Sequence, residues 1–351
     1  MSTPLPLLPT TVIGSHAIPS WVWTALKAAD AGEYGPTDRQ ETFDDAVKLA
    51  ILDQVEAGVD VITDGEMRRW YFVQGFYGKM EGLEPIGILR KQGVYGYDSV
   101  PRYRPVARIT APRGLGIVEE FTYLKEQVAR QAPGQRIKAT CPGPLTLTIH
   151  IQLREEHKPL YPDRLALAWE FAGLINRELK ALVEAGADFI QIDEPSFAII
   201  PGTQQNWVDL FNACVDGVRA KIALHVCFGN LGSRPRGKRE YGWMFPDLLR
   251  ARCDQFVFEF ANREMKEADI YQLAQIDREF GAGVVDVKSF WVEPPEEIAG
   301  RIRAFLKYVP ADKLWITPDC GFFQLPRWLC ALKLKHMVEG ARIVRRELGA
   351  G

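Results

Sequence analysis

The chain has 351 residues, of which 47% are hydrophobic and 25% are charged, and its formal net charge is −2. This composition is sufficient for a large buried core, and the near-neutral charge lacks the basic footprint typical of nucleic-acid binders. The six cysteines lie far apart, and no signal peptide or membrane-spanning stretch is recognisable, so we expect a cytoplasmic protein with reduced thiols and no nucleic-acid or membrane partner.

Short runs rich in valine and isoleucine alternate with longer amphipathic stretches. The predicted strands cover residues 10–14, 59–63, 136–140, 188–193, 222–226, 255–260, 283–287 and 314–317. The clearest predicted helices cover residues 37–57, 162–184, 294–308 and 326–348, and Gly58 is expected to end the first of them. Eight strands alternating with helices predict an α/β fold, a single (β/α)8 (TIM) barrel domain over residues 1–351. An open doubly wound sheet is the alternative, but no early strand is followed by G-x-G-x-x-G.

Two segments depart from this alternation. Residues 70–112 are rich in tyrosine, glycine and arginine, and we interpret them as an excursion with hairpin character after the second strand. Residues 228–243 form a loop with a basic cluster at 233–239. The cluster is typical of a solvated loop, although it also suits an anionic substrate or a partner.

Every predicted strand ends on polar or titratable residues. Active-site groups of parallel barrels come from the C-terminal ends of the strands, and burying so many polar groups is costly unless they serve a site. The sequence therefore predicts an enzyme. The strand ends carry Ser15, Glu66, Cys141, Asp193, His225, Cys227, Glu259, Asp286, Lys288 and Cys320.

His225 and Cys227 are two positions apart at the end of a predicted strand. Their side chains would point to the same side, about 6.6 Å apart along the chain, and could share one metal ion. The neighbouring strand ends supply Glu259 and Cys320, which would complete a four-ligand zinc site. Packed core residues and a Cys–His nucleophile pair are the alternatives. For the cysteines outside this set, core packing is the leading interpretation.

The motifs Ile13-Gly-Ser15, Asp64-Gly-Glu66, IQIDEP (190–195), His225-Val-Cys227 and PDCG (318–321) together resemble cobalamin-independent methionine synthase. The resemblance is to its C-terminal catalytic barrel, in the short single-barrel "core" form, and it extends over nearly the whole chain. It implies a methyltransferase of methionine biosynthesis, in which a zinc-bound homocysteine thiolate accepts a methyl group to give methionine.

The resemblance also implies roles for individual residues. His225, Cys227, Glu259 and Cys320 would bind Zn²⁺, and Ser15 with the backbone of Ile13 would hold the amino-acid carboxylate. Glu66 and Asp193 would pair with the substrate ammonium group, which suits two carboxylates. A structural ion pair of these carboxylates with Arg68 or Arg69 is the alternative.

Three departures from the family pattern bear on the methyl donor. We expect no second barrel before this one. His150 stands near the position of the folate-stacking aromatic, and Asp286-Val-Lys288 replaces the Asp-x-His associated with proton handling. The implied donor is a methyl-corrinoid, free or on a carrier protein, or methyl-folate. An epoxyalkane:coenzyme M transferase-like alkylation of another thiol and a non-catalytic zinc-binding barrel remain alternative functions.

Overall fold

The computed structural model describes residues 4–69, 72–87, 100–200, 202–229 and 238–350. The chain divides into two compact units. Unit 1 comprises residues 1–68, 123–138 and 257–351, and unit 2 comprises residues 69–122 and 139–256. The prediction of one domain over the whole chain stays a prediction. Within the described ranges, no helix has the length and apolar character needed to cross a membrane.

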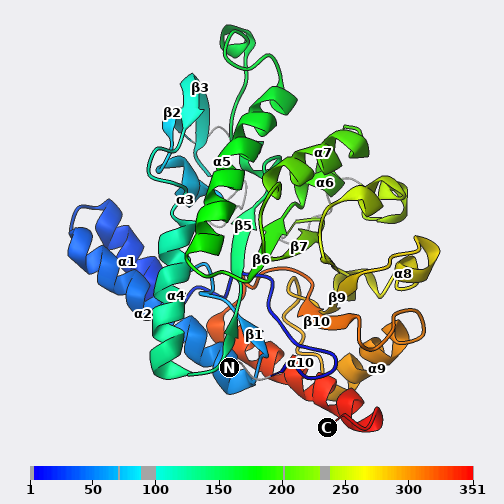
Figure 1. Cartoon of the computed structure of the whole chain (residues 1–351). Coiled ribbons are helices and arrows are strands. Elements are labelled where there is room, and N and C mark those ends of the chain that lie inside the picture. The colour runs from blue at the N-terminus through cyan, green and yellow to red at the C-terminus, as the bar shows by residue number, and fades with distance from the viewer. Residues whose placement is uncertain (1–3, 70–71, 88–99, 201, 230–237, 351) are drawn as a thin grey trace. The chain divides into compact units, whose positions relative to one another are not determined.

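The strands follow the predicted alternation. They are β1 (Val61–Ile62), β2 (Glu81–Gly87), β3 (Arg102–Thr110), β4 (Arg136–Ile137), β5 (Ala139–Pro142), β6 (Phe189–Asp193), β7 (Lys221–Val226), β8 (Gln255–Phe258), β9 (Glu279–Val285) and β10 (Leu314–Pro318). Six of them form one sheet in the order β10-β9-β8-β7-β6-β5. In unit 2, β5, β6 and β7 lie side by side and pair in parallel (Figure 1). In unit 1, β1 pairs with β4 and β9 with β10, also in parallel.

The first predicted strand forms only isolated bridges. Thr10 pairs with Ile316 of β10, and Thr11 pairs with Val61 of β1. Residues 10–11 therefore lie between β10 and β1 in unit 1 and pair in parallel with both. This is the strand order that the predicted barrel requires.

In the described ranges, seven longer helices separate the strands. They are α1 (Ser20–Asp30), α2 (Pro36–Ala57), α4 (Ile117–Gln131), α5 (Arg164–Glu184), α7 (Gln204–Cys214), α9 (Pro295–Phe305) and α10 (Arg327–Glu347), and the shorter ones are α3 (Gln74–Tyr77), α6 (Ser196–Ile199) and α8 (Ile270–Leu273). The four predicted helices are confirmed as α2, α5, α9 and α10. Gly58 ends α2 as expected, because its φ of 81° lies in the left-handed region that glycine adopts without strain.

β9 begins four residues before the predicted strand at 283–287. Gly281 and Gly283 weakened the strand pattern, yet the fold needs glycine there. A Cβ atom at Gly281 would lie 2.9 Å from a methyl group of Val257, and one at Gly283 would lie 2.3 Å from Asp319 Oδ1. These glycines therefore mark close approach between neighbouring segments, which is their usual meaning inside a strand.

The predicted excursion contains a hairpin. β2 and β3 pair in antiparallel fashion within unit 2, which confirms the hairpin character of residues 70–112. Residues 70–71 and 88–99 of the excursion lie outside the described residues, as do residues 230–237, which hold most of the basic cluster.

Candidate active site

The end of β7 carries His225 and Cys227, and both side chains are buried. Because side chains two positions apart in a strand share one face, a nitrogen donor and a sulfur donor stand next to each other. The carbonyl of the intervening Val226 accepts a hydrogen bond from the Tyr241 hydroxyl at 2.9 Å. This bond fixes the backbone that presents the pair.

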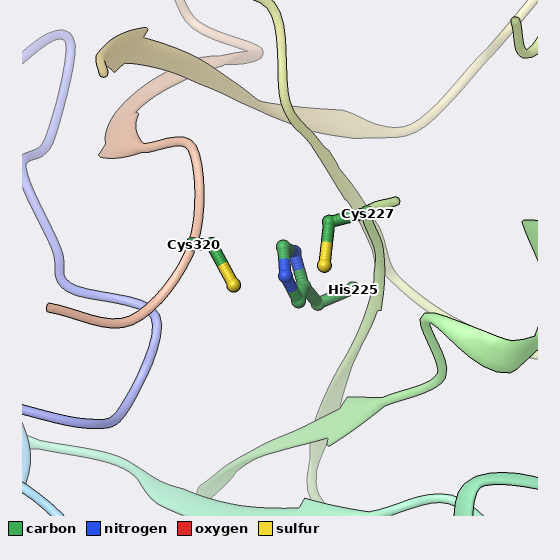
Figure 2. Close-up of side chains that lie close together, drawn as sticks. All are labelled: His225, Cys227 and Cys320. Carbon is green, nitrogen blue, oxygen red and sulfur yellow. The ribbon is translucent and has the colours of Figure 1, made fainter. Parts of the chain in front are cut away.

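His225, Cys227 and Cys320 form a group with the donor atoms of a metal site. One ligand atom of each lies within 4.8 Å of the other two, and Figure 2 shows the three side chains converging. Zinc binds nitrogen at about 2.0–2.1 Å and thiolate sulfur at about 2.3 Å, so tetrahedral ligand atoms stand roughly 3.3–3.8 Å apart. Small side-chain movements would bring the three onto one ion. The donor set and its spacing therefore fit zinc.

Glu259, the fourth implied ligand, is fully buried in unit 1, where it forms an ion pair. Its two carboxylate oxygens accept hydrogen bonds from Lys288 Nζ at 3.0 and 2.8 Å. The Lys288 amide in turn donates to Asp286 Oδ1 at 2.7 Å. The structure thus brings three predicted residues of unit 1 together, Glu259, Asp286 and Lys288.

Asp319 orders the segment that follows Glu259. Its carboxylate accepts hydrogen bonds from the backbone amides of Phe260, Ala261 and Asn262 at 2.8, 2.9 and 2.6 Å. Burial, together with the charge of Glu259, raises the pKa of Asp319 to about 8. Because Asp319 immediately precedes Cys320, one side chain links the backbone of two predicted ligands.

Ser15 and Glu66 lie together in unit 1. The Ser15 hydroxyl donates to Glu66 Oε2, and the Ser15 carbonyl accepts from the Phe322 amide at 2.7 Å. A Cβ atom at Gly14 would lie 2.4 Å from Glu66 Oε1, so the glycine of the Ile-Gly-Ser motif makes room for this carboxylate. Glu66 itself has a φ of 54°, a strained conformation for a residue other than glycine that is common at functional sites.

Arg68 and Arg69 have acidic partners of their own. Arg68 pairs with Asp44, and Arg69 donates to Glu120 Oε2 at 2.7 Å. Arg69 also donates to the Thr140 carbonyl and hydroxyl at 2.7 and 2.9 Å. These contacts give each guanidinium group an acidic partner, and an ion pair with Glu66 or Asp193 stays an alternative.

Asp193 ends β6 in unit 2, where it is buried and opposite His225 in the parallel register. The side-chain amide of Gln191 donates to Asp193 Oδ1 at 2.7 Å. Because a neighbouring amide fixes one oxygen, the carboxylate is oriented before any ligand binds. Asp193 and the histidine of the metal group therefore come from adjacent strand ends.

Glu194 is a buried carboxylate that the sequence argument treated only as part of a motif. It accepts hydrogen bonds from the Leu145 amide at 2.8 Å and from the Thr146 amide and hydroxyl at 3.3 and 2.9 Å. Burial raises the pKa of Glu194 to about 8. Glu194 thus holds the Gly-Pro-Leu-Thr loop after β5 in place, and its position beside Asp193 was the available signal.

Gly143→Ala is expected to destabilise the protein by about 1–3 kcal/mol, because inserting a methyl group into a packed interior forces side chains or backbone to shift. A Cβ atom at Gly143 would lie 2.1 Å from both Cγ and Oε1 of Glu194. Chemical denaturation measures the effect, with Gly78→Ala as a surface comparison, since nothing lies within 4 Å of a Cβ atom there and its φ of −69° is open to any residue. Equal losses in both variants would contradict the proposed contact.

His150 lies in unit 2 against Arg102. The Arg102 Nη1 group donates to His150 Nδ1 at 2.9 Å, and the His150 ring is nearly perpendicular to that of Tyr77, 6.3 Å away. Burial and the charge of Arg102 lower the pKa of His150 to about 3. The ring is therefore neutral at physiological pH, with Nδ1 as acceptor and the proton assigned to Nε2.

His16 is a further buried group that the sequence argument left without a role. Its Nε2 lies 2.9 Å from Asp53 Oδ2, and its Nδ1 lies 3.3 Å from the Cys330 sulfur. Although burial disfavours the charged ring, Cys330 and Asp53 raise the pKa of His16 to about 9. Arg327 binds both oxygens of Asp53 at 2.8 and 2.6 Å. These contacts anchor His16, the residue next to Ser15, to Asp53 of α2 and to Cys330 of α10.

Comparisons with known proteins agree over nearly the full chain. Residues 8–343 match the family model described as cobalamin-independent synthase, catalytic domain. The chain is 37% identical to a methionine synthase of Saccharolobus solfataricus and 35% identical to one of Sulfurisphaera tokodaii. Each alignment covers 98% of this chain, and it covers 97% and 94% of the relatives, respectively.

Among solved structures, a B12-independent methionine synthase from Shewanella sp. W3-18-1 in complex with selenomethionine is similar with a TM-score of 0.82. It is 27% identical, and the match covers 98% of this chain and all of that one. The predicted fold class, an α/β barrel of parallel strands, is thereby confirmed.

Proposed function

Because the chain belongs to the cobalamin-independent methionine synthase family, we propose that it transfers a methyl group to the sulfur of homocysteine and releases methionine. The family and the full-length likeness show a methyltransferase of the methionine synthase type. The convergence of His225, Cys227 and Cys320 is the observation that carries the finer proposal, because histidine nitrogen and cysteine sulfur are the donors that zinc prefers.

We assign zinc to this group, with Glu259 as the fourth ligand. Zinc bound there would lower the pKa of a thiol ligand, so that a nucleophilic thiolate exists at neutral pH. Cys320 is partly exposed, whereas His225, Cys227 and Glu259 are buried. Lys288 holds the Glu259 carboxylate and balances its charge.

Two pairs of groups suit the amino-acid part of homocysteine. Ser15 with the backbone of Ile13 offers donors for the carboxylate, and Glu66 and Asp193 offer anionic acceptors for the ammonium group. Both carboxylates are buried and already oriented by hydrogen bonds from Ser15 and Gln191. Charge-assisted hydrogen bonds of this kind would distinguish homocysteine from a thiol that lacks an amino group.

In the proposed reaction, the sulfur supplies the electron pair of the new S–CH₃ bond. The bond between the methyl carbon and the donor breaks, and its electrons stay on the donor. The donor is a methyl-corrinoid, free or on a carrier protein, or methyl-folate, and His150 would contact it. Asp286 and Lys288 are assigned to proton handling. The backbone amide of Lys288 donates a hydrogen bond to the Asp286 carboxylate.

Removal of zinc tests this function. Prolonged treatment with a chelator is expected to abolish methyl transfer from methylcobalamin or methyl-folate to homocysteine, and adding about one equivalent of Zn²⁺ is expected to restore it. Metal analysis and methionine formation are measured on the same samples, and Mg²⁺ addition is the control. Full activity in metal-free protein would contradict the proposal.

A further inference from the structure

Arg102 and Arg164 of unit 2 have positive charges that no carboxylate of the described residues matches. Arg102 Nη1 donates to the Ile149 carbonyl at 2.6 Å and to His150 Nδ1 at 2.9 Å. Arg164 Nη1 donates to the carbonyl and hydroxyl of Thr148, both at 2.9 Å. Each arginine thus uses a single nitrogen, on consecutive residues of one loop.

The other nitrogens of these two arginines are available. Among the described residues, neither Nε nor Nη2 of Arg102 or Arg164 donates a hydrogen bond, and no carboxylate lies within ion-pair distance of either group. The other arginines of β3 differ, since Arg104 pairs with Glu84 and Arg108 pairs with Glu170. Of the described arginines of β3, Arg104 and Arg108 thus have carboxylate partners, whereas Arg102 contacts the loop at 148–150 instead.

The Arg102 side chain is partly buried, whereas that of Arg164 is exposed. Burial lowers the pKa of both guanidinium groups, and the charge of Arg102 lowers that of Arg164 further. Both groups also act electrostatically on Tyr77, whose ring lies 4.8 Å from that of Tyr103. Two like charges held against neighbouring residues of one loop are stabilised by an anion between them.

We propose that Arg102 and Arg164 bind an oxyanion, a carboxylate or a phosphate, of the methyl donor. The free Nε and Nη2 of each guanidinium form the fork that binds two oxygens of such a group, which an ammonium group could not do. The ring of Tyr103 is partly exposed and packs against the buried ring of Tyr77. The assignment to the donor rests on the proposed function, whereas oxyanion binding itself does not.

Direct binding to the full zinc-loaded chain tests the site, with inorganic phosphate and free triglutamate as probes in separate calorimetric titrations. Arg102→Gln and Arg164→Gln are each expected to weaken the bound probe about tenfold to a hundredfold, the effect of losing a charge-assisted pair. Arg104→Gln is the matched control on the same strand and is expected to change affinity less than about twofold. Preference for phosphate indicates a phosphate-bearing donor, and preference for triglutamate indicates a carboxylate-bearing one.

A second variant keeps the test valid if a glutamine variant unfolds. Arg102→Lys retains the charge but loses the fork, and it is expected to bind the probe more weakly than wild type while keeping its thermal unfolding temperature. No probe binding by wild type, or the same affinity in wild type, Arg102→Lys and Arg164→Gln, would overturn the site. If the probe binds as expected but no thiol is methylated, the oxyanion site stands and the proposed function fails.

Discussion

Cys320→Ala is expected to lose its zinc on dialysis, from about one ion per chain to less than about 0.1, and to lose methyl transfer with it. A thiolate contributes a large share of the binding free energy of a structural or catalytic zinc, so removing one ligand of four weakens binding roughly a hundredfold to a thousandfold. Metal analysis after dialysis and initial rates of methionine formation measure the two effects.

The control is a cysteine outside the metal group. Cys253→Ala removes a partly exposed thiol and is expected to keep both zinc and activity. Thermal unfolding of apo-protein separates loss of metal from loss of fold, since Cys320 is partly exposed and its truncation leaves no large cavity. A Cys320→Ala protein with full zinc content and turnover would show that the ligand set is wrong.

The metal group was predictable because strand geometry places its members. His225 and Cys227 follow from a spacing of two at a strand end, and Cys320 follows from the end of the last strand. The ion pair of Glu259 with Lys288 was not predictable, because it depends on side-chain directions from two different strand ends. The sequence pattern indicates which residues lie at the same end of a sheet. Side-chain packing then determines which of these residues are in contact.

The supporting groups were less visible in the sequence. Glu194 and His16 lie next to predicted site residues, but their partners are Thr146 and Asp53, which are distant in the sequence. The fold shows the same limit, since the start of β9 was missed where Gly281 faces Val257. From local propensity alone, such a glycine predicts the end of a strand. The close approach that requires glycine is a tertiary contact, which the local sequence does not show.

Asp193→Asn is expected to lower kcat/KM for homocysteine about a hundredfold, and to change the rate with a thiol such as 2-mercaptoethanol less than about threefold. The substitution keeps the shape of a buried side chain but removes the charge that would pair with the substrate ammonium, a loss of about 2–5 kcal/mol when the partner charge is left unpaired. The Gln191 amide can still donate to the asparagine oxygen, so the backbone of β6 should be undisturbed.

Asp188→Asn is the matched control, because Asp188 is exposed and precedes the same strand. Parallel measurements with homocysteine and the simple thiol separate amino-acid recognition from chemistry at sulfur, since both thiols would need the same activation. Equal losses with the two thiols would remove Asp193 from recognition of the ammonium group. That result would favour a physiological thiol without an amino group, and the same zinc ligands would then serve a different alkylation.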